Sequence, residues 1–117
     1  MNIPEIQRIS IEIRKGFERK EIDSTILKEL YQIYNPLKDI DSFVTNAMEM
    51  FPRLNCGLAT LLLRKRLKNG IVINVKYAGE NHTFLLLEGN IVVDITADQY
   101  NGPKVYVGAI KDPWSVS

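Results

Sequence analysis

The chain is poor in the residues that build disulfides and metal centres, with one cysteine and one histidine among 117 residues. A lone cysteine cannot close an internal disulfide, which fits a reducing compartment. One cysteine and one histidine are also too few for a structural zinc site of the usual Cys/His type. We therefore expect no structural zinc, and the thiol chemistry considered below needs neither a metal nor an organic cofactor.

Excess charge and long apolar runs are scarce as well. The formal net charge is +1, so no overall field would draw the protein to nucleic acid or to an acidic membrane. No apolar stretch reaches the roughly 18 residues that a membrane-spanning helix needs. The first residues, 1–6, lack the basic start and apolar run of a signal peptide. We expect no nucleic-acid or membrane partner, and either a cytoplasmic location or delivery as an effector.

The apolar residues that are present change their spacing halfway along the chain. Helical spacing and stop signals predict helices over about 6–17, 24–33, 39–50 and 55–68. Short β-branched and aromatic runs predict strands over 71–77, 82–87, 91–95 and 105–107. This order predicts an α+β fold with N-terminal helices packed on a small antiparallel sheet. We expect a single domain over 1–117, helical to about residue 50, with the candidate catalytic core over about 51–110.

Cys56 stands where the fourth helix should begin. Thiols at helix N-termini ionise more readily, because the helix dipole and unpaired backbone N–H groups favour the thiolate. Asn55 would cap this helix, and the backbone donors, including the N–H of Cys56, could hold an oxyanion. Alternatively, Cys56 is a small buried hydrophobe that starts an apolar helix.

Asp94 is the residue that makes the lone histidine, His82, a candidate catalytic group. A strand histidine such as His82 is usually a surface residue or a satisfied core residue, whereas a carboxylate in an apolar strand is costly without a partner. If the loop over 88–90 has three residues, Leu87 pairs with Ile91 and His82 and Asp94 become diagonal neighbours on one face. A two-residue loop would put them on opposite faces.

Together these residues predict a catalytic triad. Asp94 would fix the tautomer of His82, whose other ring nitrogen would face the thiol of Cys56. Such a triad transfers acyl groups through a thioester: water as second acceptor gives a peptidase, amidase or deamidase, and an amine gives a transferase. The expected substrate is a protein, a peptide or a small amide.

Three blocks of sequence carry a family resemblance, namely Phe51-Pro52-Arg53-Leu54-Asn55-Cys56-Gly57, His82-Thr83-Phe84 and Asp94-Ile95-Thr96-Ala97-Asp98-Gln99-Tyr100. Over about residues 40–108 the chain resembles small bacterial proteins in the transglutaminase-like and NlpC-type branch of the papain-like superfamily. The resemblance implies nucleophile Cys56, base His82 and orienting Asp94. The chain departs from larger relatives at Phe84, where tryptophan is commoner, and it lacks an upstream oxyanion glutamine. The oxyanion donor could be backbone, Asn55 or Gln99.

Two other functions stay open. The domain could be a toxin-type effector that modifies a target protein and is restrained by an immunity or regulatory protein. It could also be a non-catalytic binding module with a vestigial triad.

Four further features of the sequence have a structural interpretation, a functional one or both. The basic run over 64–68 is interpreted as a solvated helix end rather than a nucleic-acid patch. Gln99 could line the cleft or brace a turn, and Trp114 is interpreted as a packing anchor or partner contact. Asp98 is the second candidate, after Asp94, for the carboxylate that orients His82.

Overall fold

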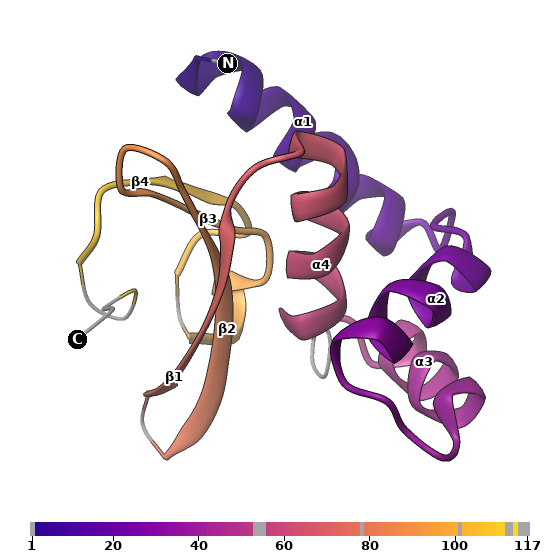
Figure 1. The fold of residues 1–117 in the computed structure, drawn as a ribbon. Helices are drawn as coiled ribbons and strands as arrows, with labels where there is room; N and C mark the ends of the chain where they lie inside the picture. The colour runs from indigo at the N-terminus through magenta and orange to yellow at the C-terminus, as the bar shows by residue number, and fades with distance from the viewer. Residues whose placement is uncertain (1, 53–55, 78, 101, 112–113, 115–117) are drawn as a thin grey trace.

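The computed structural model describes residues 2–52, 56–77, 79–100, 102–111 and 114. Within these residues the chain forms an α+β fold, as the sequence predicted (Figure 1). Its elements are α1 (Ile3–Glu18), α2 (Ser24–Tyr34), α3 (Ile40–Glu49), α4 (Cys56–Leu67), β1 (Ile71–Tyr77), β2 (Glu80–Leu87), β3 (Ile91–Asp94), the 3-10 helix η1 (Ala97–Tyr100) and β4 (Tyr106–Gly108).

Short polar side chains start the first three helices. The side-chain oxygens of Asn2, Asp23 and Asp39 accept hydrogen bonds from the N–H groups of Glu5, Thr25 and Ser42, at 2.9, 2.8 and 3.1 Å. Such caps satisfy backbone donors that have no partner inside a helix. The hydrogen bonds from the backbone and side chain of Ser42 also lower the pKa of Asp39. α1 begins at Ile3, earlier than its apolar spacing suggested, because Asn2 caps it.

The strands form one antiparallel sheet in the order β1-β2-β3-β4. β1 pairs with β2 along its whole length, whereas β3 pairs with β2 only at Leu85–Leu87. The loop before β3 has Gly89 and Asn90 at φ 86° and 61°, the left-handed conformation that glycine and asparagine tolerate best. This loop sets the register Leu87↔Ile91, as predicted for a three-residue connection.

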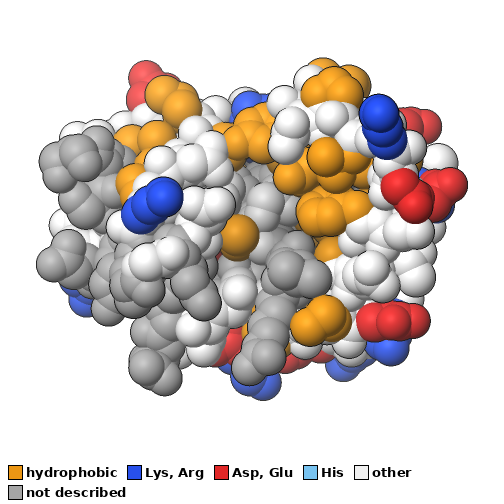
Figure 2. Space-filling model, turned by 90° about the horizontal axis from the view of Figure 1, so that it is seen from below, with side chains coloured by type: hydrophobic (Ala, Val, Ile, Leu, Met, Phe, Trp, Pro, Cys, Tyr) orange, Lys and Arg blue, Asp and Glu red, His pale blue; other side chains and the backbone are white. Residues whose placement is uncertain are grey.

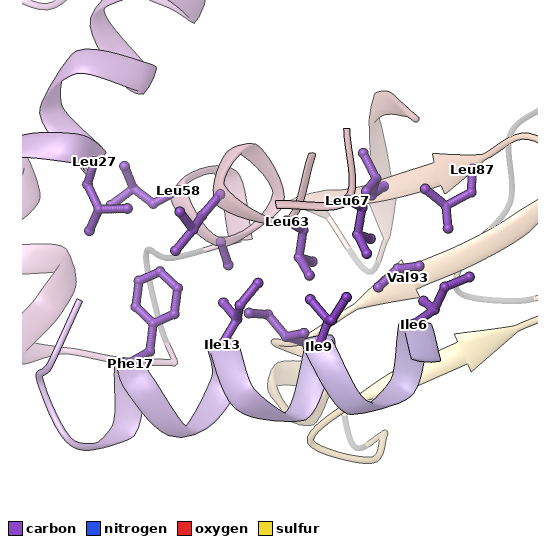
Figure 3. Packing of buried hydrophobic residues seen from close by; sticks show 14 of the residues in the cluster. Ile6, Ile9, Ile13, Phe17, Leu27, Leu58, Leu63, Leu67, Leu87 and Val93 are labelled. Atoms are coloured by element: carbon purple, nitrogen blue, oxygen red, sulfur yellow. The ribbon is translucent and has the colours of Figure 1, made fainter. Parts of the chain in front are cut away.

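The main core lies between the helices and one face of the sheet. Figure 3 shows the apolar side of α1 facing α4, with Leu87 and Val93 of the sheet at one end of the cluster. α4 is buried on nearly every side in its first two turns, from Leu58 to Leu63, because it lies between the sheet and the other helices. Its exposed residues, Arg64, Lys65 and Arg66, come at the C-terminal end.

A second, smaller core covers the opposite face of the sheet. It consists of Phe84, Val92, Ala97 and Trp114, with five partly buried neighbours. The C-terminal segment that brings Trp114 there lies across the sheet from α4 (Figure 1). Both faces of the central strands are therefore out of water. None of the described helices has the length and apolarity needed to cross a membrane.

Candidate functional site

His82 and Asp94 form a buried pair on the sheet face that the second core covers. Nε2 of His82 lies 2.8 Å from Oδ2 of Asp94. The side chains are 0% and 2% exposed. The predicted register produces this contact, because it places both side chains on one face of neighbouring strands.

Two further residues bind the carboxylate of Asp94. Oδ1 accepts from the backbone N–H of Thr96 at 2.9 Å and from the Thr96 hydroxyl at 3.2 Å. Oδ2 accepts from Nε1–H of Trp114 at 2.8 Å, in addition to its contact with His82. Each oxygen thus has two partners, which matches the acceptor-only character of an ionised carboxylate.

This arrangement determines which nitrogen of His82 carries its proton. An ionised Asp94 can only accept, so the facing Nε2 must be the donor. In the neutral imidazole, Nδ1 then holds the lone pair. Asp94 therefore selects the tautomer in which Nδ1 can act as a base.

Aromatic rings surround the pair. The Phe84 ring lies 5.3 Å from the His82 ring, and the Trp114 ring lies 6.4 Å from it. Trp114 is itself stacked on Tyr106, with centroids 3.7 Å apart and planes 3° apart. These rings keep water from the carboxylate and strengthen its hydrogen bonds.

Trp114 is the site residue whose contact the sequence did not predict. It packs as expected of an anchor, since it is 4% exposed, but it also donates to Asp94. The available signal was chemical: an indole N–H that is buried needs an acceptor, and Asp94 was the carboxylate expected in the core.

Cys56 is the first residue of α4 and is half-buried. Its carbonyl accepts from Oγ1 of Thr60 at 2.6 Å, and the same Oγ1 lies 3.5 Å from the carbonyl of Thr83. The first turn of α4 therefore meets β2 at the residue next to His82.

The helix and the imidazole approach β2 from different faces. The leucines of α4 pack with Leu85 in the main core, whereas His82 shares the face of Phe84. Because β3 pairs with β2 only at Leu85–Leu87, the edge of β2 beside His82 is outside that strand pairing. The structure therefore brings His82 to Asp94 on one face of the sheet and packs the helix that carries Cys56 against the other.

The remaining candidates have defined places. Asn55 lies outside the described residues. Gln99 donates through Nε2 to the carbonyl of Thr96 at 3.3 Å, so its side chain braces the turn that follows β3. Asp98 pairs with Arg14, which gives it a partner other than the histidine. Among the residues that the structure describes, no cluster of three or more His, Cys, Asp or Glu side chains could hold a metal ion.

Comparison with protein-family models, with curated proteins and with solved structures finds no match. The resemblance to the transglutaminase-like and NlpC-type branch stays a prediction. The function is therefore inferred from the contacts within this chain.

Proposed function

We propose that the protein is a cysteine-dependent acyl-group hydrolase or transferase of papain-like type, with Cys56 as nucleophile, His82 as base and Asp94 as orienting group. The observation that carries this proposal is the buried His82–Asp94 contact of 2.8 Å. Burying a carboxylate and an imidazole is costly. Orienting a general base is a use that accounts for both groups.

The first half of the reaction forms a thioester. Nδ1 of His82 takes the proton of the Cys56 thiol, and the sulfur attacks the carbonyl carbon of an amide or ester. The S–C bond forms as the carbonyl π electrons move to oxygen. Backbone N–H groups at the start of α4 stabilise this oxyanion. When the carbonyl reforms, the bond to the amine or alcohol breaks and the imidazolium gives its proton to the leaving group.

The second half releases the acyl group. Water or an amine loses a proton to His82 and attacks the thioester carbon, after which the S–C bond breaks and sulfur leaves as thiolate. Protonation from His82 restores the thiol. The substrate that this chemistry predicts is a protein, a peptide or a small amide, and the same three residues serve hydrolysis and transfer equally. A toxin-type effector that modifies a target protein, with an immunity protein as partner, would use the same steps.

Alkylation of the thiol tests the proposal, because Cys56 is the only cysteine. We expect iodoacetamide to label native Cys56 faster at neutral pH than the urea-unfolded chain. We expect His82→Ala to slow labelling at least tenfold and Asp94→Asn to slow it as well. Labelling that is no faster than in the unfolded chain, and unchanged in His82→Ala, would contradict the proposal.

A non-catalytic binding module with a vestigial triad is the second candidate. The observation that favours it is the complete burial of His82. Apolar side chains are also exposed on the face seen in Figure 2. Among the described residues, Ile33, Tyr34 and Met50 are 85%, 37% and 47% exposed. A binding module predicts slow, histidine-independent labelling, the opposite of the result expected for the enzyme.

A further inference from the structure

Arg14 brings a buried positive charge from α1 to the segment that follows Asp94. Its side chain is 6% exposed. Nη1 and Nη2 donate to Oδ1 and Oδ2 of Asp98 at 2.8 and 2.9 Å, and Nη1 also donates to the carbonyl of Ile95 at 2.9 Å. Ile95 directly follows Asp94, so the guanidinium fixes the backbone at the end of β3.

The same guanidinium also contacts an aromatic ring, that of Phe51. The Cζ atom of Arg14 lies 4.6 Å from the centre of the Phe51 ring, a cation–π distance. Phe51 also stacks on Phe17 of α1, with centroids 5.2 Å apart and planes 4° apart. A single side chain of α1 thus contacts both the end of β3 and the stacked pair of Phe51 and Phe17.

We propose that Arg14 is a positioning residue that fixes the backbone after Asp94, and with it the carboxylate that binds His82. This inference rests on the proposed function for its catalytic consequence. It gives the N-terminal helix a role in the site besides its share of the core. Arginine suits this role because its planar fork binds a carboxylate in bidentate fashion and stacks on a ring, which lysine cannot do.

A purely structural role would lower stability and leave the folded site unchanged. The single histidine and the single tryptophan allow a positioning role to be distinguished from a purely structural one. The Hε1 ring proton of His82 and the indole N–H of Trp114 each give one NMR signal, and both side chains bind Asp94. These signals report the geometry around Asp94 whether or not the protein is an enzyme.

Arg14→Lys is the test, and Arg8→Lys is its matched control. Arg8 is on the same helix, is 63% exposed and pairs with Glu12 at 3.6 Å. Below the melting temperature of each variant, we expect Arg14→Lys to shift both signals and to slow labelling of Cys56 about 10- to 100-fold, the range for a misplaced group. We expect Arg8→Lys to change neither.

Folded Arg14→Lys with wild-type signals and labelling would overturn the inference. If Arg14→Lys does not fold, Asp98→Asn decides by the same signals, because it keeps the shape of Asp98 but removes the charge that pairs with Arg14. Failure of the proposed function looks different: the wild-type protein would then label no faster than His82→Ala. The two NMR signals would still decide the role of Arg14.

Discussion

At the scale of single residues, Asp94 organises the hydrogen bonds of the candidate site. Its contacts with Thr96, Trp114 and His82 occupy both oxygens, so the orientation of the imidazole follows from one carboxylate. The sequence predicted the contact with His82, because the length of one loop determines which side chains share a face. It did not predict the contact with Trp114, because the connection after β4 has no periodic pattern that places it.

Trp114→Phe tests the contribution of the indole N–H. The substitution removes the donor to Oδ2 of Asp94 and leaves a buried acceptor with one partner fewer. We expect the free energy of unfolding, measured in urea, to fall by about 1–3 kcal/mol.

Tyr106→Phe is the matched control for this change. It removes a hydroxyl that donates to the carbonyl of Ala109 in an exposed position, while keeping the ring that stacks on Trp114. We expect it to change stability by no more than about 0.5 kcal/mol. If Trp114→Phe costs no more than Tyr106→Phe, the hydrogen bond to Asp94 does not stabilise the site.

At the scale of elements, α1 ends in a charged network that ties it to the strand region. Glu18 lies 3.3 Å from Nε of Arg14 and 3.3 Å from Nζ of Lys104, just before β4. Desolvation raises the pKa of Glu18. Hydrogen bonds from Lys104 and Arg14, with the charges of both, outweigh it and hold the pKa below its ordinary value of 4.5.

This lowered pKa predicts how acid destabilises the protein. The unfolded chain binds the proton of Glu18 at a higher pH than the folded chain does. The free energy of unfolding therefore decreases as the pH is lowered. The contribution of Glu18 to stability is complete above its ordinary pKa. It is lost as the pH falls through the lowered pKa of the folded protein. We expect Glu18→Gln to lose less stability than wild type between pH 6 and pH 3, measured by urea unfolding.

Glu12→Gln is the control for this profile. Glu12 lies on the same helix, is 58% exposed and forms loose ion pairs, at 3.6 and 3.5 Å. We expect its acid profile to follow the wild type. A Glu18→Gln profile that also follows the wild type would show that the network does not couple to folding.

The sequence predicted the elements better than their contacts. The register of β2 with β3 depends on the length of one short loop, so a local pattern is sufficient to predict it. The pair of Arg14 with Asp98 spans 84 residues. Arginines and aspartates are common on surfaces, and nothing in their spacing distinguishes the pair that becomes buried.

At the scale of the whole molecule, two chain segments cover the two faces of one sheet. The helices pack on the face that carries Leu85, and the segment that includes Trp114 packs on the face that carries Phe84. The order of helices followed by strands predicted that helices cover one face of the sheet. It did not predict that the segment with Trp114 covers the other face. The residues of the proposed site belong to different layers: Cys56 is on α4, which packs in the layer of helices, and His82 lies beside Trp114 on the other face.

Formation of an acyl-thioester tests the proposed catalysis most directly. The protein is mixed with p-nitrophenyl acetate, quenched in acid and measured by mass spectrometry at intervals. We predict an acetyl adduct on Cys56 that forms and then decays, about 10²–10⁴-fold faster in wild type than in His82→Ala. An adduct that is confined to lysines, or that forms on Cys56 equally fast in His82→Ala, would contradict the account.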